Sequence, residues 1–324
     1  MGQNGPNLNT GQGDNPTMTL QDLTTALSTQ MPPVFRWAGA MARQLRHFDI
    51  GIPGKKTSGF ANADALTLAD LSVQELLVGA LRDGNPLLRQ CRLEAEESSG
   101  DLDYFATDAD YTIVLDPIDG TEKYRDHSGD GWSIMLNLRS LETVHYSLVY
   151  VPEVGANGTW VEAVGNRIIC GEDDPNRPAT DVLRELAPID ANARPDSNTI
   201  RLSAPLDTPE HLRVMADAGF QPIKSAPASA NLYDLFARGA VGGQVIHTPN
   251  VYDFPVFLHM ARMLGGDALW VHNQQPVTFH DIWLDERADM LRLPGIVACS
   301  ANRETLMALC RLARDWDPVR YHEA

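Results

Sequence analysis

Two aspartates, Asp116 and Asp119, lie three positions apart in the stretch Tyr111–Tyr124, which reads YTIVLDPIDGTEKY. The apolar run at the start of this stretch predicts a short buried strand that stops at the two acids. Carboxylates about 5 Å apart repel each other by roughly 3 kcal/mol at an effective dielectric near 20, so such a pair either shares a proton or binds a cation. Oxygen donors of this kind favour Mg²⁺, Ca²⁺ or Mn²⁺ over zinc. The alternative is a polar turn in which Asp119 caps a following helix.

Three other acidic positions could join this pair, but each has a local explanation. Asp70 follows Thr67 in a capping-box pattern at the start of a predicted helix. The run Glu94–Glu97 could be a solvated surface segment. Asp253 precedes the predicted helix 254–264 and could be its N-cap. The spacing alone therefore leaves the cation site and the structural roles open.

Bulk composition limits the classes of protein. The chain has 324 residues, 43% of them hydrophobic, and a formal net charge of −17, which disfavours nucleic acid or an anionic membrane as a partner. Its four cysteines show no metal-binding spacing, and no apolar stretch is long enough for a membrane helix. With no basic and apolar leader at the N-terminus either, we expect a cytoplasmic protein.

The pattern of elements predicts two packed halves. We expect a disordered tail at 1–17, an N-terminal α+β half at 18–175 and a C-terminal α/β half at 176–324. In the first half we expect helical segments within 20–47, broken in two by Pro32 and Pro33, and a loop-rich stretch at 84–110. An antiparallel meander follows, with strands at 132–138, 144–151 and 159–164, and then a linker at 171–198. After the linker we expect alternating strands and helices: strands at 199–203, 221–224, 240–247, 268–272 and 295–299, and helices at 208–218, 229–238, 254–264 and 302–314.

The ordered motifs resemble those of the inositol monophosphatase superfamily of Mg²⁺-dependent, lithium-sensitive phosphatases. Its signature D-P-[IL]-D-G-T stands here as Asp116–Thr121, and Glu-Glu-Ser at 96–98, Thr67–Asp70 and Tyr252-Asp253 fall in the family order. The likeness covers about 34–314. It implies an α/β (α+β) fold, a layered αβαβα sandwich of the sugar-phosphatase type with an antiparallel N-terminal sheet and a mixed C-terminal sheet.

The resemblance also implies roles for particular residues. Glu96, Asp116 and the carbonyl of Ile118 would hold one Mg²⁺, and Asp116, Asp119 and Asp253 a second, while Glu96 and Glu97 reach a weaker third position. Asp70 and Thr121 would relay a proton from the attacking water, with Glu96 orienting that water. The backbone of Gly120 and Thr121 would cradle phosphate, and Lys56 would lie near the substrate entrance. Mn²⁺ could replace Mg²⁺, Ca²⁺ or Li⁺ would inhibit, and the family likeness points to a homodimer.

The substrate stays open at this stage. In inositol monophosphatases an acid binds the inositol hydroxyls about seven residues before the last metal aspartate, where Ile246 and His247 stand here. The stretch Ala228–Leu232 also lacks the lysine that bisphosphate nucleotidases use. We expect hydrolysis of a small phosphorylated polyol or sugar, with Ser229, Asn231 and His247 contacting its non-phosphate half. The alternatives are 3′(2′),5′-bisphosphate nucleotidase or fructose-1,6-bisphosphatase activity. A catalytically silent binding or regulatory relative, or a Ca²⁺-sequestering protein, would be of a different class.

Overall fold

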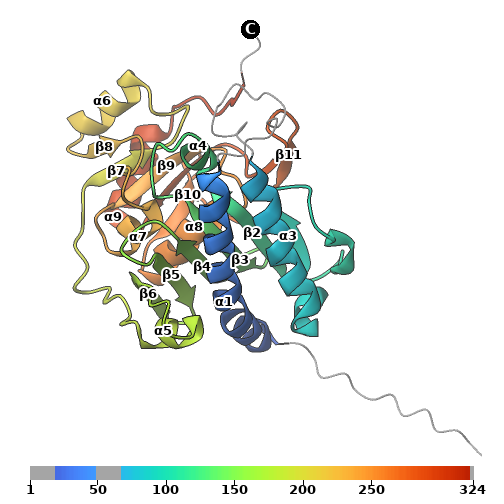
Figure 1. Cartoon of the computed structure of the whole chain (residues 1–324). Helices are drawn as coiled ribbons and strands as arrows, with labels where there is room; N and C mark the ends of the chain where they lie inside the picture. The colour runs from blue at the N-terminus through green and yellow to red at the C-terminus, as the bar shows by residue number, and fades with distance from the viewer. Residues whose placement is uncertain (1–18, 49–66, 322–324) are drawn as a thin grey trace, which may run out of the picture.

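The computed structural model describes residues 19–48 and 67–321. The expected disordered tail and Lys56 therefore lie outside the described residues. Within the described part, two sheets alternate with three helical layers, and Figure 1 shows helices α1 and α3 in front of the first sheet. This arrangement confirms the predicted αβαβα sandwich.

The first sheet has six strands in the order β1-β2-β3-β4-β5-β6. The meander is antiparallel as predicted, whereas β1 pairs with β2 in parallel. Strand β1 lies inside the stretch 84–110 that was predicted to be loop-rich. The strands span Arg92–Ala95, Thr112–Asp119, Ser133–Arg139, Val144–Val151, Thr159–Val164 and Arg167–Glu172. Because β1 and β2 are parallel neighbours with Ala95 opposite Leu115, Glu96 follows β1 next to Asp116 on β2.

Strand β2 carries both aspartates of the motif. It continues to Asp119 instead of stopping at Asp116, and its register to β3 shifts between these two residues. Gly120 then adopts a left-handed conformation with φ of 87°, a value that favours glycine, and starts the short helix α4 (Thr121–Arg125). This irregular strand end aims Asp116, Asp119 and Thr121 toward the edge of the sheet.

Helices α1 (Leu20–His47) and α3 (Leu68–Asp83) cover the outer face of this sheet. The predicted break in α1 is wrong, because the helix continues through Pro32 and Pro33. An interior proline costs about 3 kcal/mol. Here buried side chains on both sides of the prolines, including Leu27 and Phe35, hold the two halves of the helix in one core. In contrast, the predicted capping box of Thr67 and Asp70 is confirmed at the start of α3.

The second sheet is mixed, as predicted, with the order β10-β13-β9-β7-β8. Strands β7, β8 and β9 are parallel to one another, while β13 is antiparallel to both β9 and β10. The strands span Thr199–Leu202 (β7), Gln221–Ile223 (β8), Gly243–His247 (β9), Asp267–Trp270 (β10) and Ile296–Ser300 (β13). The parallel strands β7 and β9 end at the same edge, so the residues that follow them lie together.

Helices α7 (Leu232–Ala237) and α8 (Phe254–Met263) form the layer between the sheets. Their apolar side chains share one core with side chains from both sheets, among them Val114 and Val297. Helices α6 (Pro209–Asp217) and α9 (Arg303–Ala313) pack on the outer side of the second sheet. The strands of the first sheet all lie before the expected boundary at 175/176, and those of the second sheet all lie after it. The division of the chain into two halves stays a prediction.

Several smaller elements complete the described chain. They are η1 (Pro86–Gln90), η2 (Leu102–Tyr104), the hairpin of β11 (Trp283–Asp285) and β12 (Met290–Arg292), and α5 (Ala179–Glu185), which lies in the segment expected to be a linker. All four cysteines are free and buried. None of the helices formed by the described residues is long and apolar enough to cross a bilayer.

Candidate active site between the two sheets

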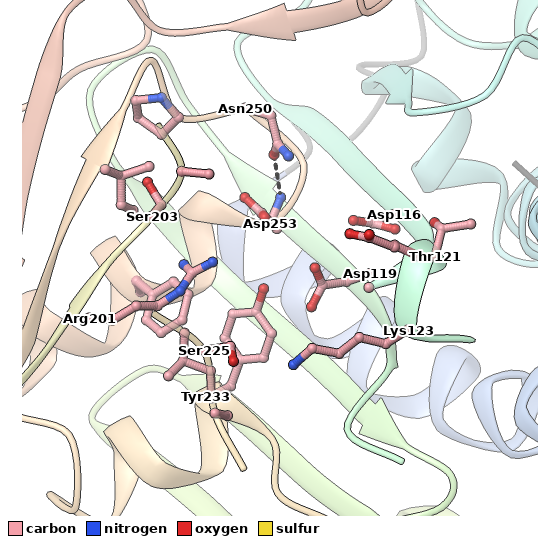
Figure 2. Close-up of a pocket in the computed structure, with 18 of the residues that line it drawn as sticks. Asp116, Asp119, Thr121, Lys123, Arg201, Ser203, Ser225, Tyr233, Asn250 and Asp253 are labelled. Atoms are coloured by element: carbon pink, nitrogen blue, oxygen red, sulfur yellow. Dashed lines mark hydrogen bonds between the residues drawn. The ribbon is translucent and has the colours of Figure 1, made fainter. Parts of the chain in front are cut away.

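A pocket of about 540 Å³ lies where the end of β2 meets the ends of β7 and β9. Figure 2 shows Asp116, Asp119 and Thr121 on one side of it, and Asp253, Asn250 and Arg201 on the other. The pocket therefore joins residues from both halves of the sequence. Its charged lining residues are Glu96, Asp116, Asp119, Glu122, Lys123, Arg201, Asp207, Lys224, Asp253, Arg292 and Arg320, and His247 also lines it.

Asp116 is the most constrained of the acids. Its side chain is buried, and no described residue gives its Oδ1 atom a hydrogen-bond partner. Burial raises the pKa of Asp116 well above its usual range, and repulsion from Glu96, Asp119 and Asp253 raises it further. A buried carboxylate oxygen without a partner is costly, so this position calls for a cation or a proton.

Asp119 and Asp253 face Asp116 from different elements. Burial raises the pKa of Asp119, while the charge of Arg201 and hydrogen bonds from Tyr233 and Ser133 lower it. Burial and the charge of Asp119 raise the pKa of Asp253 to about 7, against the opposing charge of Arg201. Asp253 is the N-cap residue of α8, as the sequence suggested, but its side chain makes no capping hydrogen bond, so capping does not account for its carboxylate. Its own N–H donates to Asn250 Oδ1 at 2.9 Å, the bond dashed in Figure 2.

The donor set fits a hard divalent cation. Glu96, Asp116, Asp119 and Asp253 line the pocket and offer only oxygen, with the Ile118 carbonyl beside them. No three His, Cys, Asp or Glu side chains in the described ranges form a ready-made metal cage. Three features therefore favour a metal: the oxygen donors, the unpartnered Asp116 oxygen and the mutual repulsion of the acids. A divalent cation would give that oxygen a partner and relieve the repulsion.

Thr121 connects the pocket to Asp70. Its hydroxyl lies 3.0 Å from Asp70 Oδ1 and 2.8 Å from the Ile118 carbonyl oxygen, so it donates to one of these two. Asp70 itself does not line the pocket. Burial raises its pKa to about 6, although hydrogen bonds from Thr67 oppose that rise. Asp70 thus belongs to the capping box of α3 and also contacts Thr121, so its structural role and its predicted role in proton transfer are compatible.

The other residues predicted to bind metal, phosphate or substrate separate into two groups. Ile118, Gly120, Asn231 and His247 line the pocket, whereas Ser229 is exposed outside it and Glu97 is buried away from it. The amide of Asn231 is already engaged, since it accepts from the Tyr233 N–H and donates to the Gly131 carbonyl. The geometry thus gives no support to substrate binding by Ser229 or to a metal contact by Glu97, and it assigns the Asn231 side chain to holding the wall of the pocket.

Three further residues that no sequence motif marked also line the pocket: Arg201, Tyr233 and Arg320. Arg201 and Ser203 occupy alternate positions at the end of β7, and both line the pocket. That alternation was readable at the end of a predicted strand. Arg320 lies far along the chain from every motif, and nothing local in its sequence points to the pocket.

Comparisons with known proteins agree with this geometry. The model of the inositol monophosphatase family matches residues 24–254, more than half of the chain. None of the curated protein sequences matches significantly. Among solved structures, extragenic suppressor protein SuhB from Bartonella henselae has a TM-score of 0.61 at 17% identity, covering 90% of this chain and 100% of that one. CysQ from Bacteroides thetaiotaomicron has a TM-score of 0.59 at 18% identity, covering 88% and 100%. An IMPase/NADP phosphatase complexed with Mg²⁺ and phosphate has a TM-score of 0.59 at 15% identity, covering 89% and 95%.

The layered sandwich and its oxygen-rich acidic pocket agree with the metal-dependent phosphatases that the matching family model describes. The chain belongs to the inositol monophosphatase family, whose members are metal-dependent phosphomonoester hydrolases acting on small phosphate esters.

Proposed function

We propose that this protein is a Mg²⁺-dependent phosphomonoesterase that hydrolyses a small phosphorylated polyol or sugar in the pocket between its sheets. The observation that carries the proposal is the buried Asp116 oxygen without a partner, surrounded by three further carboxylates. Four such carboxylates carry a charge of −4 when ionised, which two divalent cations would cancel. The IMPase/NADP phosphatase of similar fold binds Mg²⁺ and phosphate, which supports the same cation here.

In this proposal Glu96, Asp116 and the Ile118 carbonyl hold one cation, and Asp116, Asp119 and Asp253 hold another. When bound, these cations would neutralise phosphate charge and lower the pKa of a coordinated water. The carbonyl of Ile118 has a second lone pair available beside the Thr121 hydroxyl, so both contacts are compatible.

Thr121 and Asp70 handle the proton. The Thr121 hydroxyl lies between the pocket and Asp70, and Asp70 has a pKa of about 6, so it exchanges a proton near neutral pH. Glu96 orients the attacking water. The N–H groups of Gly120 and Thr121, which follow the end of β2, contact the phosphate oxygens.

Specificity within the family is the finer part of the proposal. Burial, together with the charge of Arg320, lowers the pKa of His247 to about 4, so the imidazole that lines the pocket is neutral. Its ring nitrogens lie 3.3 Å from Thr248 Oγ1 and 3.2 Å from the Asp317 carbonyl oxygen, so a contact with a polyol hydroxyl would replace one of these two. The alternatives are bisphosphate nucleotidase or fructose-1,6-bisphosphatase activity. The similar fold of CysQ is the reason to test bisphosphate nucleotidase activity. A silent binding relative is disfavoured because it would have no need to hold four mutually repelling acids together.

The remaining expectations belong to the same proposal. They are two or three cations per site, replacement of Mg²⁺ by Mn²⁺, inhibition by Ca²⁺ or Li⁺, a homodimer and a cytoplasmic location. Nucleic acid is not expected as a partner at a net charge of −17.

The test is phosphate release from a panel of sugar, polyol and nucleotide monophosphates and bisphosphates. We expect release with Mg²⁺ and its loss when a chelator removes the metal. If purified protein releases no phosphate from any ester with Mg²⁺, Mn²⁺ or another divalent ion, the proposed function is wrong.

A further inference from the structure

Two buried hydroxyl groups from different parts of the chain donate to the Asp119 carboxylate. Ser133 lies opposite Asp119 in the register of β2 and β3, and its Oγ donates to Asp119 Oδ2 at 3.2 Å. The Tyr233 hydroxyl, from α7, donates to the same carboxylate, and Figure 2 shows it directed into the pocket beside Asp119. One donor thus comes from the first sheet and the other from the layer between the sheets.

The Asn231 side chain joins these two donor residues. Its Nδ2 group donates to Ser133 Oγ at 3.4 Å and to the Gly131 carbonyl at 2.9 Å, while its Oδ1 accepts from the Tyr233 N–H at 2.9 Å. Asn231 and Ser133 are at most 1% exposed, and Tyr233 is 3% exposed. Because the donors and the acceptor of this buried amide are all engaged, it holds one orientation and fixes Ser133 relative to Tyr233.

The backbone around this network is closely packed as well. The Asp130 N–H donates to the Ala228 carbonyl at 2.7 Å, which ties the segment before β3 to the segment before α7. A Cβ atom added at Gly131 would lie 2.1 Å from the Ala230 carbonyl oxygen, so only glycine allows this approach of the two segments. Two segments far apart in the sequence thus support the network together.

Aromatic packing holds the Tyr233 ring. The rings of Tyr233 and Phe257 have their centroids 4.5 Å apart, and Phe257 makes an edge-to-face contact with Phe236 at 5.5 Å. All three aromatic residues are at most 3% exposed. With the ring held in this way, the Tyr233 hydroxyl keeps its position beside Asp119.

The arrangement suits a carboxylate that binds a cation through its remaining lone pairs. An ionised carboxylate has about four acceptor positions, so two hydroxyl donors leave others for a metal. Hydrogen bonds of this kind set the direction of carboxylate ligands in metal sites. Buried hydroxyl groups need partners in any fold, so a network that serves stability alone would contain the same bonds. The two roles differ in what they predict for metal affinity.

We propose that Ser133, Asn231 and Tyr233 are positioning residues for the metal site. Ser133 and Tyr233 aim the Asp119 carboxylate at the cation that it shares with Asp253, and Asn231 keeps the two donors in place. This inference rests on the proposed function, in which Asp119 is a metal ligand. It gives Asn231 a role in metal binding in place of the expected contact with the substrate.

Isothermal titration calorimetry of the metal-free, full-length protein with Mg²⁺ at pH 8 tests the inference. Tyr233→Phe and Ser133→Ala each remove one hydroxyl and keep the rest of the side chain. We expect the dissociation constant for Mg²⁺ to rise roughly 10- to 100-fold in each variant, the usual cost of losing a group that orients a metal ligand. Ser133→Thr, which keeps a hydroxyl, should bind Mg²⁺ more tightly than Ser133→Ala.

Tyr146→Phe is the matched control. Tyr146 is buried on β4, and its hydroxyl donates to Glu162 Oε1 at 3.0 Å, but neither residue lines the pocket. Loss of this hydroxyl should lower the free energy of unfolding in chelator and leave the Mg²⁺ dissociation constant at the wild-type value. A purely structural network predicts that same result for Tyr233→Phe.

The inference is overturned if Tyr233→Phe and Ser133→Ala, shown to be folded by thermal unfolding in chelator, bind Mg²⁺ as tightly as the wild type. That result leaves the proposed function standing, because the wild type still binds the cation. If the wild type itself binds no divalent ion, the proposed metal site is wrong and the positioning role falls with it.

Discussion

Asp116 and Asp253 are buried acids whose ionised forms are unfavourable in the folded protein without a bound cation. Burial and neighbouring acids raise both pKa values, that of Asp253 to about 7, so ionising these groups costs folding free energy. The same repulsion is what a divalent cation removes on binding. Residues of this kind contribute affinity for a cation and reduce stability in its absence.

Asp119→Asn tests this relation because it removes a charge and keeps the shape. We expect kcat with Mg²⁺ to fall by more than about 100-fold, the upper range for residues that only support a metal ligand. We also expect the metal-free variant to be more stable than the wild type by on the order of 1 kcal/mol, because one repelling charge is gone. Phosphate release and thermal unfolding in chelator measure the two effects.

Asp217→Asn provides the matched control, since Asp217 is exposed at the end of α6. It should change neither quantity. If Asp119→Asn keeps wild-type turnover, Asp119 is not a metal ligand in this reaction.

At the scale of elements, a chain of buried polar groups links the first sheet to α8 just before Asp253. Ser147 on β4 donates to Asn137 Oδ1 on β3 at 2.7 Å, so the ring N–H at Nδ1 of His259 donates to Ser147 at 3.0 Å. Asn137 in turn donates to the backbone carbonyl of Tyr252 at 3.1 Å. These bonds fix the backbone that carries Asp253 relative to the strands beside β2.

His259 makes this link sensitive to acid. Burial lowers the pKa of His259 to about 3, below its usual 6.5, so between these values the unfolded chain binds a proton that the folded protein does not. Stability is therefore lost as the pH falls below 6.5, by about 2 kcal/mol at pH 5 from this residue. In His259→Gln, which keeps an N–H donor and cannot titrate, the loss of unfolding free energy between pH 7 and pH 5 should be smaller by that amount.

Urea unfolding at several pH values in chelator measures this difference without interference from metal binding. His272→Gln is the matched control, because His272 is exposed and should keep the wild-type pH dependence. An unchanged slope in His259→Gln would mean that another buried group, such as His247, accounts for the acid sensitivity.

At the scale of the whole molecule, local sequence patterns predicted most of the architecture. The capping box at Thr67, the meander and the alternating second half all form as expected, because each depends on short-range periodicity and caps. The break at Pro32 and Pro33 was predicted wrongly because tertiary packing outweighs a local helix signal. Strand β1 was missed because its four residues are all half-buried and overlap the acidic run Glu94–Glu97.

The pocket was predictable only where a motif marks it. Asp116, Asp119 and Thr121 lie together in one signature, and the family pattern adds Glu96 and Asp253. Arg201 is marked only by its alternation with Ser203 at the end of a predicted strand, and Arg320 has no local mark, because the fold alone brings it to the pocket. A formal charge of −17 gives no sign of the five Lys and Arg residues that line the pocket, because the net charge of a chain carries no information about a single site.

The position of the acids predicts that Mg²⁺ stabilises the molecule as a whole. Asp116 and Asp119 come from β2 and Asp253 precedes α8, so a shared cation would tie the first sheet to the start of α8. At a concentration 100 times its dissociation constant, the ion should add about 2.7 kcal/mol to the free energy of unfolding. Thermal denaturation at pH 8, compared with KCl of equal ionic strength, measures this gain.

At pH 5.5 the gain should be smaller, because Asp253, with a pKa of about 7, binds a proton in competition with the metal. Equal midpoints in Mg²⁺ and KCl at pH 8 would mean that the acids do not share an ion.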